Sequence, residues 1–180
     1  GLLSSRYDKN TNSFTQMTDT GGTITTSLVD GQYLYVNYNS ANGLNYATLQ
    51  EKPPGADRKR VYKLTGKTDQ IGTFNFTFKD RTVPASGYTT PLLWGGNSPD
   101  CTGQISVFAA SDTFYYSIPD LNITGTFTDI DGTQRTVKKG KAWMDHQWFK
   151  STPPSDWVGH YWSSLSLTES NNIYATNPHH

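Results

Sequence analysis

Short runs in which apolar and polar residues alternate recur along the chain, and this period of two is typical of half-buried β-strands. The run GTFNFTFK at 72–79 places its phenylalanines on one face and polar residues on the other. The run LNITGTFT at 121–128 separates its leucine, isoleucine and phenylalanine from its asparagine and threonines in the same way. Further strands are predicted at residues 23–29, 32–38, 45–50, 60–65, 104–109, 113–118, 134–138, 140–149 and 159–168.

The segments between these runs carry turn and loop residues, and none shows the periodicity of an amphipathic helix. Asp131-Gly132 predicts a hairpin turn between two strands. Residues 83–103 are rich in Pro, Gly and Ser and predict a long loop that carries Trp94; loops of this length are usually functional or disordered. About nine to eleven short strands without helices predict an all-β fold, either a barrel or a sandwich.

Composition supports this fold class and excludes several kinds of partner. Aromatic residues make up 13% of the chain, which favours strands. The 15 Lys and Arg residues balance the 15 Asp and Glu residues, so we expect no nucleic-acid partner. No apolar stretch approaches the roughly 18 residues that a membrane span needs. The lone Cys101 fits a buried thiol, or a cysteine whose partner lies in another sequence.

Two N-glycosylation sequons fall on predicted strands. They are Asn75-Phe76-Thr77 and Asn122-Ile123-Thr124. In both strands the asparagine belongs to the polar face, where a glycan would not disturb the core. We therefore expect Asn75 and Asn122 to be glycosylated, in a protein that is secreted or lies in the lumen of the secretory pathway.

The stretch GKAWMDHQWF at 140–149 places a histidine between polar residues and tryptophans. In a regular strand Asp145 and His146 point to opposite faces, and the face of His146 is mostly apolar. Burial there would lower the pKa of His146 and leave its ring neutral near pH 7, able to donate or accept a hydrogen bond. The alternative is a core histidine whose hydrogen bonds are satisfied. The face of His146 also holds Ala142, Met144 and Trp148, and the face of Asp145 also holds Lys141, Trp143, Gln147 and Phe149.

A second strand, at 159–168, carries His160 and Trp162 on one face. This strand and the strand at 140–149 are both rich in tryptophan and histidine. They fit two walls of one cavity, and they also fit a plain aromatic core.

Other chemistries lack their sequence patterns. The chain has no Gly-x-Ser-x-Gly elbow and no glycine-rich phosphate loop. No His, Cys and carboxylate cluster has metal-ligand spacing, so we expect no metal site. A glycosidase needs two facing carboxylates, and nothing selects a pair. Acid–base chemistry by His146 or Asp145 on a bound organic molecule stays open. The carboxylates considered for such a pair are Asp112, Asp120, Asp145 and Glu169.

Three motifs carry a resemblance to a known family. They are YYSIP at 115–119, GT at 125–126 ahead of the Asp131-Gly132 turn, and GKAWMDHQW at 140–148. With them, the segment 114–149 resembles the AttH-like superfamily, which includes carotenoid 1,2-hydratases, fungal kievitone hydratases and fungal Diels–Alderases. The strand bearing Trp162 extends the resemblance to about residue 168.

The resemblance implies two lipocalin-like antiparallel β domains with an apolar pocket, acting without a cofactor. It implies a lipocalin-like domain at 1–150 and, at 151–180, a crossover strand toward a second β domain in a missing part of the protein or in another chain. The fungal hetero-Diels–Alderases, which join a quinone methide to a terpenoid alkene, are the members that this chain resembles most. The family usually has glycine where Phe149 stands, and the acid of the hydratases has no clear counterpart beyond Glu169.

The leading hypothesis is therefore a cofactor-independent cyclase of natural-product biosynthesis that acts on a hydrophobic polyketide or terpenoid. His146 is its first catalytic candidate, and Asp145 is the second, with a positioning role favoured by its opposite face. The alternatives are a hydratase or dehydratase of an isoprenoid or isoflavonoid alkene, a carrier of hydrophobic ligands without catalysis, and, more distantly, a carbohydrate-binding module. The candidate substrate-binding residues are Trp94, Tyr116, Trp143, Trp148 and Trp162.

Overall fold

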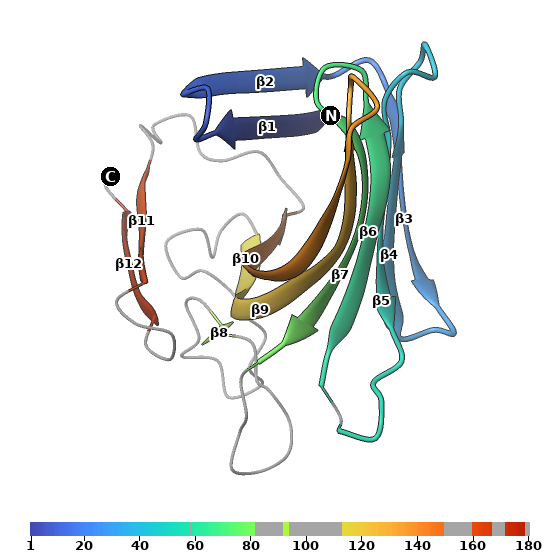
Figure 1. The fold of residues 1–180 in the computed structure, drawn as a ribbon. Coiled ribbons are helices and arrows are strands. Elements are labelled where there is room, and N and C mark those ends of the chain that lie inside the picture. The colour runs from blue at the N-terminus through green and yellow to red at the C-terminus, as the bar shows by residue number, and fades with distance from the viewer. Residues whose placement is uncertain (58, 82–91, 94–112, 150–159, 167–171, 179–180) are drawn as a thin grey trace. The chain divides into compact units, whose positions relative to one another are not determined.

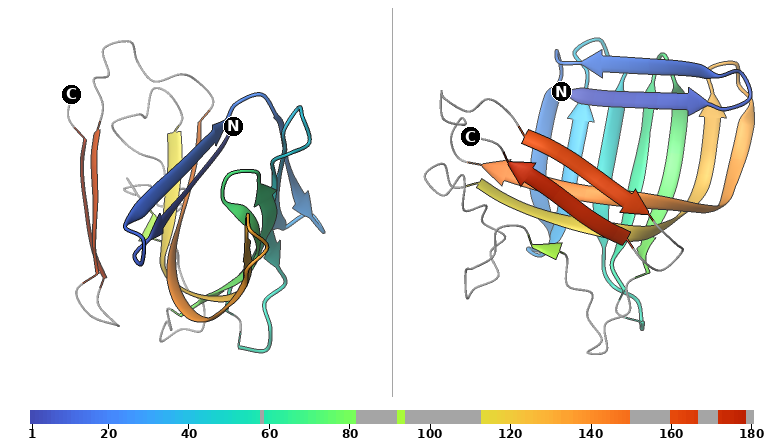
Figure 2. Two further views of the ribbon diagram at one scale, coloured as in Figure 1. Left: turned by 45° about the horizontal axis from the view of Figure 1, so that its top comes forward. Right: turned by 90° about the vertical axis from the view of Figure 1, so that its left-hand side faces the viewer.

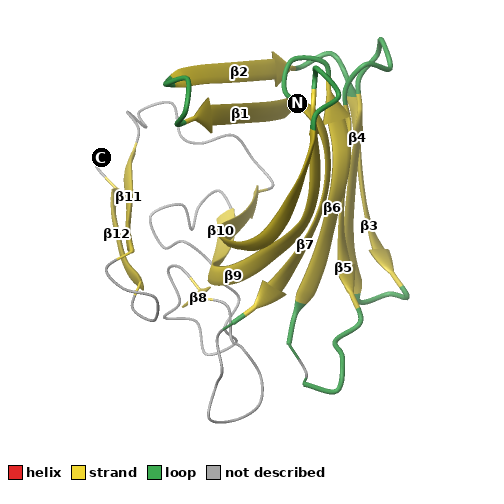
Figure 3. Ribbon diagram, in the orientation of Figure 1, coloured by secondary structure: helices red, strands yellow, loops and turns green. Residues whose placement is uncertain are grey.

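The computed structural model describes residues 1–57, 59–81, 92–93, 113–149, 160–166 and 172–178. These residues form β-strands and turns, and no helix occurs among them (Figure 3). The strands are β1 (Leu2–Asp8), β2 (Ser13–Asp19), β3 (Thr23–Val29), β4 (Tyr33–Asn39), β5 (Tyr46–Lys52), β6 (Val61–Thr68), β7 (Gly72–Asp80), β8 (Leu92–Leu93), β9 (Thr113–Asp129), β10 (Gln134–Phe149), β11 (His160–Ser166) and β12 (Asn172–Pro178).

Most strands belong to one antiparallel sheet in the order β10-β9-β7-β6-β5-β4-β3, with β8 paired to β9 (Figure 1). The hairpins β1–β2 and β11–β12 form separate two-stranded sheets. The all-β antiparallel prediction is confirmed. The large sheet runs from one edge strand to another, so among the described strands it is open and does not close into a barrel.

The chain divides into two compact units. The first comprises Gly1–Thr89 and Leu121–Ala142, and the second comprises Thr90–Asp120 and Trp143–His180. β9 and β10 each contribute one part to each unit. The domain organisation expected from the sequence, 1–150 and 151–180, stays a prediction.

The sheet of the first unit has one apolar and one mostly polar face. Residues directly opposite each other on paired strands lie on the same face, so the register assigns each side chain to its face. The apolar face holds Ile24, Leu28, Leu34, Val36, Tyr38, Ala47, Leu49, Tyr62, Leu64, Phe74, Phe76, Phe78, Leu121, Ile123 and Phe127, together with the polar Thr26, Glu51 and Asp80. The polar face holds Thr25, Ser27, Asn37, Thr48, Gln50, Lys63, Thr65, Thr73, Asn75, Thr77, Lys79, Asn122, Thr124 and Thr126, together with Val29, Tyr33, Tyr35, Tyr46 and Val61.

The phenylalanines of β7 show that the predicted alternation is correct. The ring centroids of Phe74 and Phe76 lie 6.1 Å apart, and those of Phe76 and Phe78 lie 6.3 Å apart. These distances are typical of favourable aromatic pairs. The three rings therefore form a ladder along the apolar face.

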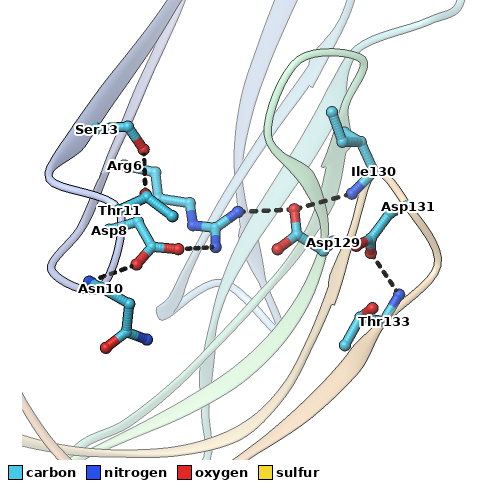
Figure 4. Close-up of polar contacts among 9 residues, drawn as sticks. All are labelled: Arg6, Asp8, Asn10, Thr11, Ser13, Asp129, Ile130, Asp131 and Thr133. Carbon is cyan, nitrogen blue, oxygen red and sulfur yellow. Dashed lines mark hydrogen bonds and ion pairs between the residues drawn. The ribbon is translucent and has the colours of Figure 1, made fainter.

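The β1–β2 hairpin lies across one end of this sheet (Figure 2). Arg6 of β1 forms an ion pair with Asp129 at the end of β9, with 2.7 Å between Nη1 and Oδ1. Its guanidinium also pairs with Asp8 at 3.1 Å and lies 5.3 Å from the ring centroid of Phe127. We call Arg6, Asp8 and Asp129 the hairpin clasp (Figure 4). Because Phe127 belongs to the apolar face, the hairpin packs on that side of the sheet.

A second set of contacts attaches the other end of the hairpin. The hydroxyl of Tyr38 donates a hydrogen bond of 2.5 Å to the Asp19 carboxylate, and Asn45 Nδ2 donates another of 2.9 Å. These bonds lower the pKa of Asp19. Burial, followed by the contact with Asp19, raises the pKa of Tyr38 to about 12.

Several sequence predictions need correction. β1, β2, β8 and β12 were not predicted, and β8 lies within the segment 83–103 that was expected to be a loop. β9 and β10 are continuous where breaks near residues 119 and 139 were expected. Pro119 lies inside β9, although proline usually marks an edge or the end of a strand. The predicted strand at 104–109 lies outside the described residues, as does most of the predicted loop at 83–103.

Candidate functional site

The segment of β10 that carries the catalytic candidates keeps the predicted strand alternation. Asp145 is exposed and His146 is half-buried, so the two side chains point to opposite faces. Trp143, two residues before Asp145 and on its side of the strand, donates a hydrogen bond from Nε1 to the Asp145 carboxylate. Asp145 therefore orients an indole ring on the face opposite His146.

His146 has an environment suited to a neutral hydrogen-bonding group. Burial lowers the pKa of its imidazole from the ordinary value of 6.5, because a charged ring loses its hydration in a less polar environment. The ring is therefore mostly uncharged at pH 7. In that form one ring nitrogen donates a hydrogen bond and the other accepts one.

Gly140 opens the GKAWMDHQW motif in the part of β10 that belongs to the first unit. A Cβ atom at Gly140 would lie 2.3 Å from Cγ2 of Ile123, which belongs to the apolar face. Only a residue without a side chain allows this approach. Glycine at this point of the GKAWMDHQW motif therefore has a packing role.

The structure describes the candidate aromatic substrate-binding residues to different extents. Trp143 is half-buried, and the structure places Trp148 in the same strand, β10. Tyr116 of β9 is paired with Leu93 of β8, and Trp162 of β11 is paired with Thr176 of β12. For Tyr116, Trp148 and Trp162 the backbone position alone is described, and Trp94 lies outside the described residues. The grouping of these residues around one substrate stays a prediction.

One buried carboxyl group was missed by the sequence analysis. Asp80, the last residue of β7, is only 2% exposed, and its register with Leu121 places it on the side of the apolar face. Its backbone N–H donates to the carbonyl of Arg60 at 3.0 Å. Extending the spacing of Phe74, Phe76 and Phe78 by two residues would have found this position. Asp80 adds a titratable group to an otherwise apolar side of the strand.

The hairpin clasp is a poor candidate for an anion site. Two carboxylates, from Asp8 and Asp129, already contact the guanidinium of Arg6 (Figure 4). The clasp therefore has a structural role. Over the described ranges, no three His, Cys, Asp or Glu side chains gather in a way that could hold a metal ion. A helix able to cross a bilayer is likewise absent from the residues that the structure describes.

Comparison with known proteins gives one match. The family model described as AttH-like matches residues 31–178, which is more than half of the chain and includes every candidate catalytic and aromatic residue. No curated protein and no solved structure matches the chain significantly.

Proposed function

Because the chain belongs to the AttH-like family, we propose that it is a cofactor-independent cyclase that joins or closes hydrophobic polyketide or terpenoid reactants by cycloaddition. Such a reaction converts π bonds of the reactants into σ bonds. It needs neither an external oxidant nor a net transfer of protons. The protein has to bind apolar reactants, hold them in a reactive geometry and stabilise charge on a polar atom.

The apolar face of the first unit is the observation that carries this proposal. Of its hydrophobic side chains Tyr38, Tyr62 and Leu121 are fully buried, at 4%, 1% and 1% exposed. Ile24 and Leu28 are 51% and 59% exposed, and the other hydrophobic members are half-buried. Soluble proteins rarely leave a continuous apolar surface open unless it binds something. A hydrophobic, weakly polar substrate fits such a surface.

The polar contribution in this proposal is assigned to His146, a residue of the second unit. A neutral imidazole N–H donates a hydrogen bond to a carbonyl or quinone oxygen of the diene. This bond strengthens as electron density builds on that oxygen in the transition state. The lowered pKa of His146 keeps the ring in this uncharged form across the neutral range. Asp145, on the opposite face and bonded to Trp143, acts by positioning.

The direct test incubates the purified protein with a quinone methide precursor and a terpenoid alkene. Product formation is followed by chiral chromatography against a protein-free control. The expected result is faster formation of the cycloadduct and an excess of one stereoisomer. If the rate and product ratio equal those of the control and the reactants nevertheless bind tightly, the protein is a ligand carrier and not a cyclase.

Substitutions at neighbouring positions separate the two faces of β10. Loss of one well-placed hydrogen-bond donor costs about 100-fold in rate in other enzymes, so His146→Ala should reduce the rate by a factor of this order. His146→Gln, which keeps a donor, should recover part of it. Asp145→Asn is the matched control on the opposite face and should retain most activity. Equal losses at both positions would point to a structural role for the segment.

The pH profile distinguishes cycloaddition from hydration. If neutral His146 donates the hydrogen bond, the rate should be flat above about pH 6.5 and should fall only in more acidic solution, where the ring becomes charged. A hydratase that uses a protonated group to add a proton to an alkene should instead become faster as the pH falls. A rate that increases toward acid would therefore favour the hydratase.

A further inference from the structure

The two sequons lie on neighbouring strands of the first unit. Asn75 is in β7 and Asn122 is in β9, and both side chains are exposed. These strands pair directly, with Asn75 opposite Thr126 and Asn122 opposite Lys79. Both asparagines therefore belong to the polar face.

The central residues of the sequons lie on the opposite side. Phe76 and Ile123 belong to the apolar face. In each sequon the asparagine therefore faces solvent, while the next residue points to the opposite side of the sheet. Asn122 is four residues along β9 from the partner of Asn75, a separation of roughly 13 Å along the strand. This spacing leaves room for two glycans side by side.

We propose that Asn75 and Asn122 both carry N-linked glycans, and that these glycans cover the polar face and leave the apolar face free for ligands. In each transfer the side-chain amide nitrogen forms a bond to C1 of the first N-acetylglucosamine. The bond from that carbon to a lipid pyrophosphate donor breaks, the lipid pyrophosphate leaves, and the amide loses one proton. The host's oligosaccharyltransferase and its lipid-linked donor supply this reaction in the secretory lumen. Occupancy of the two sites does not depend on the proposed cyclase activity.

The test produces the full chain with a secretion signal in a eukaryotic host and measures intact mass before and after treatment with peptide N-glycosidase. Two glycans are expected, and the enzyme should leave aspartate at positions 75 and 122. Thr77→Ala and Thr124→Ala should each remove one glycan, because the sequon hydroxyl is lost. Thr77→Ser and Thr124→Ser, which retain the hydroxyl, should keep both glycans. A secreted wild-type protein that lacks the glycan at Asn75, at Asn122 or at both would overturn the proposal.

New sequons test the assignment of the faces. Lys63→Asn creates Asn-Leu-Thr over residues 63–65 on the polar face, and Ile24→Asn creates Asn-Thr-Thr over residues 24–26 on the apolar face. Lys63 is exposed and Ile24 is 51% exposed, so the transferase can act at either position without unpacking a core residue.

Binding of a fluorescent apolar probe is then measured for each glycosylated variant before and after enzymatic removal of the sugar. The added glycan at position 63 should leave probe affinity unchanged. The glycan at position 24 should weaken it severalfold, with recovery after removal. If removing the natural glycans changes probe affinity as much as removing the sugar at position 24, the glycans do not leave the apolar face free. Mass spectra test glycosylation, whereas failure of the wild-type protein to bind any probe would count against the proposed function.

Discussion

The two faces of the sheet in the first unit are made by the same strands but differ in how their side chains are used. The polar face is rich in threonine, asparagine and lysine and carries both sequons. The apolar face carries a phenylalanine ladder and aliphatic residues, yet exposes Leu28 and Ile24 by more than half. Full burial of each such side chain would contribute about 1.5–3 kcal/mol to the free energy of unfolding. The comparison teaches that part of this stabilisation is not realised, which leaves on the apolar face the exposed hydrophobic surface that the proposed function needs.

The largest loss of stability is expected for a substitution where β9 lies closest to the backbone of β7. Gly125 of β9 has φ of 141°, and a Cβ there would lie 2.1 Å from the carbonyl oxygen of Asn75. Gly125→Ala should therefore destabilise the fold by about 3 kcal/mol or more, through overpacking and backbone strain. Denaturant unfolding monitored by tryptophan fluorescence measures the loss.

Gly132→Ala is the matched control for this substitution. Gly132 has φ of 86° in the turn between β9 and β10, but a Cβ there would meet nothing within 4 Å. Its cost should be that of the backbone conformation alone, about 1–2 kcal/mol. Equal losses at Gly125 and Gly132 would contradict the close approach at β7.

The second prediction compares the faces within β7. Phe76→Ala removes the central ring of the ladder and should cost about 2–3 kcal/mol, somewhat less than for a fully buried phenylalanine, because the ring is half-buried. Thr73→Ala, at an exposed position of the polar face, should cost about 0.5 kcal/mol or less. Thermal unfolding of both variants provides the comparison, and a larger loss at Thr73 would reverse the assignment of the faces.

A smaller effect is expected where the hairpin meets the apolar face. Arg6→Ala removes the ion pair with Asp129 and the contact with the Phe127 ring, and should cost about 1–2 kcal/mol. Hydrogen exchange should show β1 and β2 losing protection before the rest of the sheet. Lys9→Ala, at an exposed position in the same hairpin, is the control and should leave protection unchanged.

The smallest effect is an alkaline dependence at the edge of the apolar face. Burial raises the pKa of Tyr38 to about 12 from 10, so the folded protein holds this proton more tightly than the unfolded chain. The associated stability is fully present below pH 10 and is lost as the pH rises from 10 through 12. The difference in melting temperature between wild type and Tyr38→Phe should therefore narrow over this range. Tyr46→Phe, at a tyrosine that is 41% exposed, controls for loss of a hydroxyl group.

The sequence predicted the strands whose alternation follows burial and missed those whose alternation does not. The strand at 72–79 and the turn at Asp131-Gly132 are confirmed, because half-buried phenylalanines alternate with mostly exposed polar residues in the first and the second has the expected turn residues. In the β1–β2 hairpin the relation is inverted. Arg6 is less exposed than its neighbour Tyr7, and Phe14 is 63% exposed. Contacts with distant partners decide these positions, and no local pattern encodes them.

For the candidate site, the sequence predicted local geometry better than assembly. The opposite orientations of Asp145 and His146 and the lowered pKa of His146 follow from strand alternation and burial, and the structure shows both. The hydrogen bond from Trp143 to Asp145 also joins residues on one side of a strand. Asp80 was missed because Lys79 and Arg81 beside it give the segment the appearance of a solvent-exposed strand end.

The ion pair of the hairpin clasp joins residues separated by 123 positions in the chain. During synthesis the β1–β2 hairpin therefore leaves the ribosome long before Asp129 exists. At about 5–20 residues per second, that delay is roughly 6–25 s. The hairpins from β3 to β7 form their local pairings within this interval, since each pairs with its neighbour in sequence. The hairpin is thus made before the strands of the sheet but reaches its native position after them, and until then the end of the apolar face stays accessible to chaperones.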